Sequence, residues 1–417
     1  MAVDEGLRGS RADERGRHRP LGHWDSAVSS FYLISGAMAL LVAIGLVMVL
    51  ASSSVTALSA TGGASPYGIV LDQIKYALIG VPMAWLASRL PVSFYKRVAW
   101  PALCVALVLQ LLVFTPLGVE VNGNRNWVRF AGQSLQPSEL AKLALAVWLG
   151  VVLARKRALL HRWSHVLIPG VAVAAITVGL VLLGHDLGTG IILLILVGGA
   201  LFIAGVPLRM FAVAFAVAAV GVVYLALAGG NDTRVRRINA FFDPDCDQLN
   251  ACYQTTRGLI SLASGGLTGI GLGESREKWF YLPMAYNDYI FAIIGEELGL
   301  LGTLLVLGLF GVLAIALTRV IRRHSDPFVQ IATGAIGAWI LGQAVVNIAV
   351  VVGLLPVIGV PLPLISAGGS ALVTTMTALG VVLAFARSEP GAAQALSARP
   401  GVVRRSLAVV GRRRVRG

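Results

Sequence analysis

Long apolar segments of about 20 residues dominate this sequence, and they limit what it can fold into. As an α-helix, a segment of about 20 residues crosses the roughly 30 Å hydrocarbon layer of a bilayer. Because backbone polar groups in lipid must form hydrogen bonds within their own segment, the predicted fold class is an all-α polytopic membrane protein. Ten spans are predicted, near 31–52, 68–88, 98–116, 138–154, 164–183, 188–205, 208–228, 289–318, 328–352 and 365–387.

Composition and charge agree with a membrane protein. The chain is 57% hydrophobic and only 13% charged, whereas soluble domains carry about 25% charged residues. The net charge of +14 could suggest nucleic acid, but the basic residues form short clusters between apolar segments. Such clusters are typical of topology signals and mark the cytoplasmic side of a membrane. We therefore predict no nucleic-acid partner, a multi-pass membrane protein, and two cytoplasmic termini.

This topology divides the chain into three parts. We expect a cytoplasmic basic tail over 1–30, a membrane domain over 31–387 and a second cytoplasmic basic tail over 388–417. Two longer segments, 117–137 and 229–288, then lie outside, and the second, between helices 7 and 8, is too long for a simple connection. It contains Cys246 and Cys252 in an oxidising compartment, where a disulfide would stiffen the loop. Whether they are bridged depends on geometry that the sequence does not supply.

Three carboxylates lie in or near the eighth span, in "YLPMAYNDYIFAIIGEELG" (281–299). Asp288 is at its outer end, where Asn287 or Asp288 could cap the helix or Asp288 could take part in chemistry. Glu296 and Glu297 lie about 12–14 Å further along at 1.5 Å per residue. Ionised carboxylates at that depth are expected to be paired or to face a wet cavity. Structural hydrogen bonds to neighbouring helices are the alternative.

Other polar residues are predicted on the same side of the membrane. In "QPSELAK", Glu139 and Lys142 are three residues apart on one helix face, so they can pair. The pair either makes a structural contact or forms a charged surface that binds an anionic head group. Trp127 could be an ordinary interfacial tryptophan, and Asp186 lies in the short turn "GHDLGTG". The proline-rich segment within 351–376 is expected to break the helix and line protein or a cavity.

Four motifs occur in a fixed order: "NGNRNW…QPSELAK", "HDLGTG", "ESREKWFYLPMAYNDYIFAIIGEELG" and "QAVVNIAVVVGLLPVIGVPLPLISAGGS". Together they resemble the SEDS family (shape, elongation, division and sporulation), and the resemblance extends from the first span to the tenth. It implies a peptidoglycan glycosyltransferase that polymerises lipid II on the outer face of the cytoplasmic membrane. The segments "GLVMVLASSSV" and "LPLISAGGS" resemble the division members more than the elongation members, so septal cell-wall synthesis is expected.

The same resemblance implies roles for individual residues. Asp288 matches the aspartate that the family requires, and Trp127, Glu139 and Lys142 match its other motifs. A carboxylate base would take the proton of an acceptor hydroxyl while pyrophosphate leaves as an anion. Lysine, arginine or a divalent cation such as Mg or Mn must balance that anion. The expected substrate-binding residues are Trp127, Arg129, Glu139, Lys142, Asp186 and Lys278, and other candidate cations are Arg234, Arg236, Arg237 and Arg276.

Two other classes of function compete with a polymerase. A lipid II flippase would also contain intramembrane carboxylates and broken helices, but a carrier should place its decisive charges near the midplane. A scaffold would hold division partners through its basic tails. The expected partners of the enzyme are lipid II, the growing glycan strand, membrane lipid, other division proteins and a class B penicillin-binding protein, which the resemblance implies.

Overall fold

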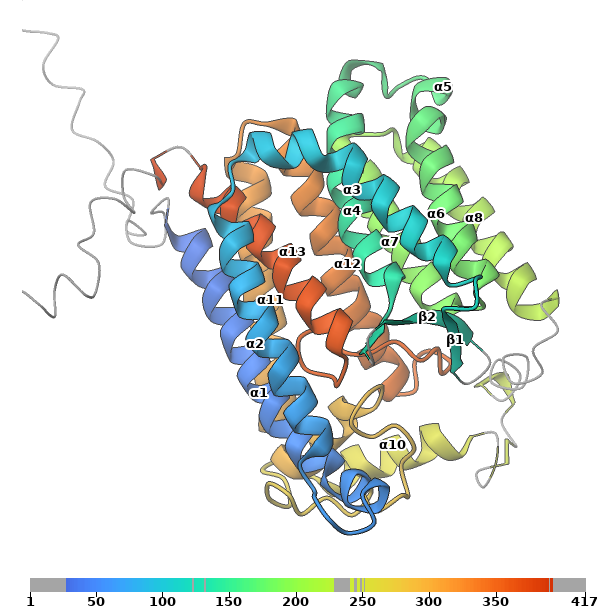
Figure 1. The fold of residues 1–417 in the computed structure, drawn as a ribbon, viewed down its shortest axis with the longest axis vertical. Coiled ribbons are helices and arrows are strands. Elements are labelled where there is room, and N and C mark those ends of the chain that lie inside the picture. Colours follow the sequence, from blue (N-terminus) through green and yellow to red (C-terminus); the bar gives the residue numbers. More distant parts are fainter. Residues whose placement is uncertain are drawn as a thin grey trace, which may run out of the picture.

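The computed structural model describes residues 28–121, 124–130, 133–228, 241–243, 246–247, 250, 252–389 and 391–392. Most of both predicted tails and a smaller part of the predicted loop 229–288 lie outside these residues, as do Arg234, Arg236 and Arg237. Helix and strand labels follow Figure 1.

The described chain is a bundle of long helices (Figure 1). Nine described helical segments are long and apolar enough to cross a membrane, so the chain is a multi-pass membrane protein. They are α1 (Ser29–Ala60), α2 (Gly68–Arg89), α3 (Val92–Leu112), α4 (Pro137–Arg155), Trp163–Leu183, α7 (Leu187–Ala204), α11 (Ile290–Arg323), α12 (Pro327–Val351) and α13 (Gly369–Arg387). The fifth segment combines α5 (Trp163–Val166), η2 (Leu167–Val171) and α6 (Ala172–Leu183), and η1 (Arg157–Leu159) precedes it.

The seventh predicted span, 208–228, coincides with α8 (Leu208–Ala228), which is not one of the nine. The full set of ten spans therefore stays a prediction. Several ends differ from the predicted ones. Helix α1 continues to Ala60 because no breaker occurs before Gly62 and Gly63, and α3 starts six residues early because "VSFYKR" is itself helical.

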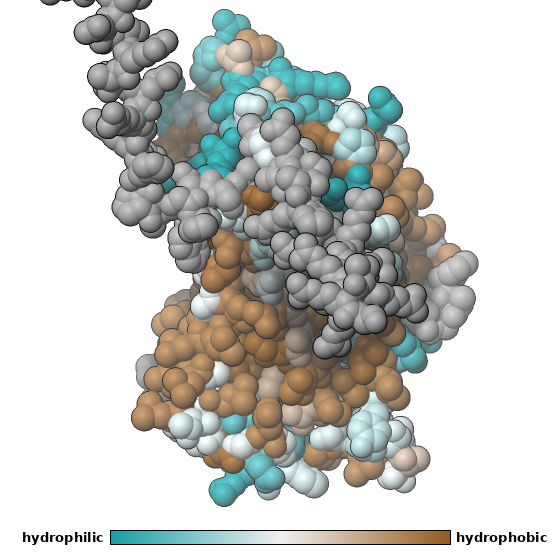
Figure 2. Space-filling model, turned by 90° about the vertical axis from the view of Figure 1, so that its left-hand side faces the viewer, coloured by the Kyte–Doolittle hydropathy of each residue, from teal (hydrophilic) through white to brown (hydrophobic). Residues whose placement is uncertain are grey.

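Helix packing separates an interior from a lipid-facing surface. Helix α12 packs against α4 and α7, α13 against α2, and α1 against α11. Leucine and valine side chains of the outer helices remain exposed, for example Leu78 and Val81 on α2. Figure 2 shows them as a broad hydrophobic belt below a polar end. Small residues allow close packing, and a Cβ on Gly380 of α13 would lie only 2.4 Å from the Ala84 carbonyl oxygen of α2.

The two ends of the bundle differ in charge and structure. One end, called here the basic end, carries Arg89, Lys96, Arg155, Arg323 and Arg387 at or next to helix ends. The other, called here the site end, carries a small sheet, the helix α10 (Tyr253–Ser264) and the N-termini of α4, α7, α11 and α13. In Figure 1 α10 runs across the lower end of the bundle.

The all-α prediction missed a three-stranded antiparallel sheet in the segment between α3 and α4. It consists of β1 (Gly118–Val121), β2 (Asn124–Phe130) and β3 (Gln133–Leu135), in the order β1-β2-β3. The sequence did contain a signal, because Asn-Gly between two short runs with β-forming residues favours a hairpin. A reading based on 20-residue hydropathy windows does not detect strands this short.

Helix α11 is interrupted at Gly299, whose φ of 67° lies in the left-handed region. The break removes two intrahelical hydrogen bonds, and a neighbouring segment replaces them. The carbonyls of Glu296 and Glu297 accept from N–H groups in the segment 266–271, and the N–H groups of the two residues after Gly299 donate to carbonyls of the same segment, at 2.9–3.2 Å. The segment before α11 is therefore hydrogen-bonded into the helix by its backbone.

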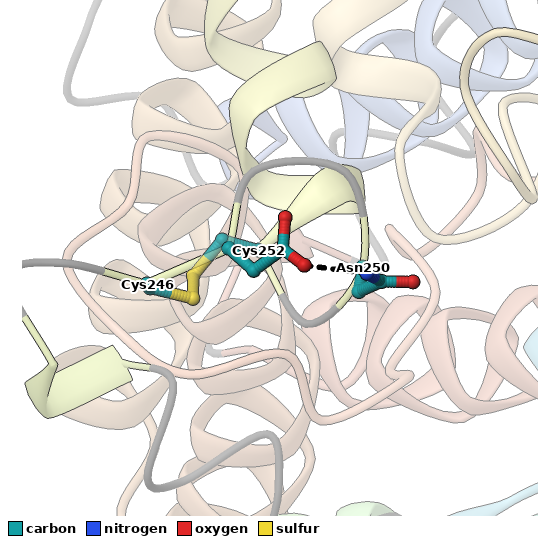
Figure 3. Close-up of a disulfide and its surroundings, with 4 residues drawn as sticks. Cys246, Asn250 and Cys252 are labelled. Carbon is teal, nitrogen blue, oxygen red and sulfur yellow. Dashed lines mark hydrogen bonds between the residues drawn. A yellow bond between two sulfur atoms is a disulfide. The ribbon is translucent and has the colours of Figure 1, made fainter.

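Two further segments shape the site end. The proline-rich segment 352–368 is not helical, as predicted, and α13 begins after it at Gly369, four residues later than expected. In the large loop, Cys246 and Cys252 form a disulfide with 6.1 Å between their Cα atoms, just before α10 begins (Figure 3). The possibility that the sequence left open is thus resolved in favour of the bridge.

Candidate active site

A cavity of about 1070 Å³ opens at the site end. Its wall combines the sheet, the N-terminal turns of α4 and α7, the chain just before α11, and the segment 352–368. Five of the predicted site residues line it, although they come from four separate elements: Trp127, Glu139, Lys142, Asp186 and Asp288. Each element ends or begins at the site end, which explains why motifs so far apart in the sequence meet there.

Asp288 lies in the turn that precedes α11. The cap position of this helix is Tyr289, so the alternative in which Asn287 or Asp288 caps the helix does not hold. The Asp288 side chain is half-buried and faces the segment 352–368, because a Cβ on Gly359 would lie 3.6 Å from its Oδ2 atom. Its carboxylate is therefore held at the cavity wall and is accessible from the cavity.

Asn347 of α12 fixes the backbone at Asp288. Its Nδ2 atom donates to the carbonyl oxygens of Asp288 and Val360, both at 2.7 Å. One amide therefore joins the chain before α11 to the segment 352–368. Ser366 adds a second link, since its hydroxyl donates to the Asn287 carbonyl at 2.6 Å. The sequence analysis did not predict these partners of Asn347.

Glu139 and Lys142 form the predicted ion pair, with 2.8 Å between Oε1 and Nζ, and both side chains are almost completely buried. Lys142 Nζ also donates to Oε1 of Gln343 at 3.2 Å and lies 4.7 Å from the centre of the Trp339 ring. Trp339 Nε1 donates to the same Gln343 oxygen at 3.0 Å. The Gln343 amide is oriented by its own Nε2, which donates to the Pro361 carbonyl at 2.9 Å.

Asp186 is the N-cap of α7. Its Oδ1 accepts from the Thr189 backbone N–H at 2.9 Å, and its Oδ2 accepts from the Thr189 hydroxyl at 2.7 Å and from Gln136 Nε2 at 3.1 Å. Both oxygens are thus occupied, and the carboxylate also links α7 to the start of α4. The preceding residue, His185, lines the cavity with a φ of 65°, a conformation that is sparsely populated outside glycine.

Trp127 lies on β2, half-buried at the cavity, and its strand is attached to the turn before α7. The Arg125 backbone N–H donates to the Gly184 carbonyl at 3.0 Å. Arg129, two positions after Trp127 on the same strand, is exposed and does not line the cavity. The structure therefore brings Trp127 into the site and leaves Arg129 outside it.

Glu296 and Glu297 form a separate buried cluster beside α10. Glu296 accepts from the hydroxyls of Ser261 and Ser275, at 3.0 and 2.6 Å, and from the Arg276 backbone N–H at 2.9 Å. These are the structural hydrogen bonds that the sequence left as an alternative. The cluster fastens α10 and the following loop to the first turns of α11.

Lys278 belongs to this second cluster and does not line the cavity. It lies 3.8 Å from Glu297 and donates to the Gly273 carbonyl. In the adjacent loop, burial raises the pKa of Glu277, and the Arg257 guanidinium 3.5 Å away opposes that shift. The predicted role of Lys278 at the substrate has no support from this position.

No group of three or more His, Cys, Asp or Glu side chains within the described residues is placed to hold a metal ion. Of the three carboxylates at the cavity, Glu139 is paired with Lys142 and Asp186 caps α7. Magnesium commonly binds through one or two carboxylates together with substrate phosphates. Asp288, whose side chain is half-buried at the cavity wall, has the donor chemistry for such a shared site.

Fold and cavity together define a class: a polytopic helical membrane protein with a carboxylate-lined cavity at one end of the bundle. A family model described as "Cell cycle protein", named for FtsW, RodA and SpoVE, matches residues 31–390. The chain therefore belongs to this family, the SEDS family that the motifs indicated.

Known relatives agree with this assignment. The chain is 41% identical over 392 residues to the probable peptidoglycan glycosyltransferase FtsW of Mycobacterium tuberculosis, covering 93% of this chain and 74% of the relative. It is 39% identical over 357 residues to the protein of the same name from Marinobacter nauticus, covering 84% and 87%.

Two solved structures share the fold. One is from a study of how a peptidoglycan synthase complex coordinates polymerisation and crosslinking. It has a TM-score of 0.70 and 27% sequence identity, and the match covers 85% of this chain and 96% of that chain. The other is the crystal structure of the rod shape determining protein RodA of Thermus thermophilus. It has a TM-score of 0.63 and 26% identity, and covers 86% of this chain and 97% of its own.

Proposed function

We propose that this protein is a peptidoglycan glycosyltransferase that polymerises lipid II during septal wall synthesis. The observation that carries the proposal is the convergence of Asp288, Trp127, Glu139 and Lys142 on one cavity. The FtsW relatives, with up to 41% identity over most of the chain, support the division type over the elongation type.

The chemistry follows from the position of Asp288. Its carboxylate takes the proton of an acceptor hydroxyl as that oxygen attacks the anomeric carbon of the donor sugar. The new C–O bond forms as the bond to pyrophosphate breaks on the opposite face, so the configuration inverts. Pyrophosphate leaves as an anion and needs no protonated acid. The wall that Asn347 and Ser366 hold in place keeps the base in one position during the transfer.

The described cavity lining contains three carboxylates and one ammonium group, so it does not balance an anionic pyrophosphate. A divalent cation such as Mg or Mn, shared between the substrate phosphates and Asp288, would supply the missing charge. Asp288 would hold such a cation, because its carboxylate lies half-buried at the cavity wall.

The orientation in the membrane follows from the basic end. Cationic clusters favour the cytoplasmic side, so the site end faces outward and both termini are cytoplasmic. Lipid II can then stay embedded by its tail while its sugar enters the cavity. The solved relative from a complex of polymerisation and crosslinking supports a crosslinking partner, and a class B penicillin-binding protein is the proposed one.

Polymerisation of lipid II by detergent-purified protein with its partner tests the proposal. We expect Asp288→Asn to lower the rate by at least about 100-fold, the usual contribution of a positioned base. The matched control is Asp72→Asn, which removes an exposed carboxylate near the same end that pairs only with Lys75; it should leave the rate unchanged. Glycan made without any bilayer separates a polymerase from a flippase. Native-rate synthesis by Asp288→Asn would refute the role of Asp288.

A further inference from the structure

The ammonium group of Lys142 has no free donor direction. Two of its three N–H groups point to the carboxylate of Glu139 and to the amide oxygen of Gln343, at 2.8 and 3.2 Å. The third side is covered by the face of the Trp339 ring, 4.7 Å away, which itself attracts a cation. The side chain is almost completely buried. A phosphate oxygen would have to displace one of these partners to reach Nζ.

The unsatisfied hydrogen-bonding atom of the pair is a carboxylate oxygen of Glu139. Glu139 uses Oε1 for Lys142, while Oε2 is buried and has no hydrogen-bond partner among the described residues. Glu139 lines the cavity and is only 4% exposed. A buried charged oxygen without a donor is strongly destabilising. The cavity therefore holds an acceptor that a donor from the substrate would satisfy.

The net charge of the pair also favours a neutral hydrogen-bond donor over an anion. Because Glu139 and Lys142 neutralise each other, the pair presents no net charge to a ligand in the cavity. An anion gains little there, whereas a neutral hydroxyl or amide N–H gains a charge-assisted hydrogen bond. We propose that the Glu139–Lys142 pair binds a hydroxyl or amide N–H of the substrate's amino sugar through Oε2 of Glu139, and that it does not bind the pyrophosphate. This inference rests on the proposed function, since it names the part of lipid II that reaches the pair.

Binding, measured without turnover, tests the inference on the full-length protein in detergent. The two probes are lipid II and undecaprenyl pyrophosphate, which has the same lipid and phosphates but no sugar. In Glu139→Gln the amide oxygen can still face Lys142, but an NH₂ donor then replaces the Oε2 acceptor. We expect lipid II to bind about tenfold more weakly, equivalent to about 1.4 kcal/mol, whereas undecaprenyl pyrophosphate should not bind more weakly.

The assignment of phosphate binding to Lys142 predicts a different result. If Lys142 binds phosphate, loss of its ammonium group should weaken the binding of undecaprenyl pyrophosphate, which would overturn the inference. The double variant Glu139→Gln/Lys142→Met replaces a neutral pair by a neutral pair, so no buried charge is left alone. We expect it to retain the affinity for undecaprenyl pyrophosphate and to lose that for lipid II; a loss for both probes would also overturn the inference.

The outcomes separate this inference from the proposed function. If the native protein binds no lipid II, the proposed function fails. If lipid II binds and Glu139→Gln does not weaken it, only the assignment of the pair fails. Thermal unfolding of each variant, with undecaprenyl pyrophosphate binding on the same sample, reports whether the protein is folded.

Discussion

Asn347→Leu tests whether the wall of the cavity positions the base. The substitution keeps the number of side-chain heavy atoms and the branching at Cγ but removes the amide that donates to the Asp288 and Val360 carbonyls, both at 2.7 Å. Each hydrogen bond contributes about 0.5–1.5 kcal/mol. If about 2 kcal/mol of this positioning is lost in the transition state, kcat falls by about 30-fold. KM should change by less than about twofold, because Asn347 is not expected to touch the substrate.

The assay is lipid II polymerisation over a range of substrate concentrations. The matched control is Thr333→Val, since Thr333 is buried on the same helix, its hydroxyl has no hydrogen-bond partner among the described residues, and it does not line the cavity. It should leave kcat unchanged. In the Asp288→Asn background, Asn347→Leu should have no further effect, because it acts through the base. Independent, multiplicative losses would refute the positioning role.

Two further predictions concern stability in detergent. Gly299→Ala should lower the free energy of unfolding by about 2–5 kcal/mol, because φ is 67° and a Cβ would lie 2.3 Å from the Gly269 backbone nitrogen. The control is Gly308→Ala, where a Cβ would have no atom within 4 Å. This variant should be neutral or stabilising in thermal unfolding. Burial lowers the pKa of His324 below its usual value near 6.5, although Asp326 opposes the shift. The neutral ring therefore stabilises the fold above about pH 6.5, and this stability is lost as the pH falls through the folded pKa. His324→Gln should flatten the decline in melting temperature between about pH 7 and 5; an unchanged decline would exclude His324 as its source.

Hydropathy predicted most of the helices because each span must bury its own backbone polar groups. The prolines of the sequence located the break after α12, since Pro356, Pro361 and Pro363 cannot continue a helix. Hydropathy missed the sheet that carries Trp127, whose strands are short, and the interruption of α11 at Gly299. That interruption depends on hydrogen bonds to a distant segment, and no local pattern encodes them.

The candidate site was predicted where a motif lies at an end of a helix or in a short turn. Asp288, Glu139 and Asp186 all fulfil that condition, and they meet at the cavity. Arg129 and Lys278 were chosen for their charge and predicted side of the membrane, which did not determine where they point. The role of Gln343 was not predicted, because its contacts with Lys142 and Trp339 join residues from two helices.

The interruption at Gly299 has a consequence for how the molecule could relay a signal. Two of the hydrogen bonds that would join the two parts of α11 are replaced by bonds to the segment 266–271. A displacement of the arginine-bearing part therefore also displaces that segment. Helix α12 is not interrupted and holds the Asp288 backbone through Asn347. It is therefore a stiffer connection than α11 between the two faces of the membrane.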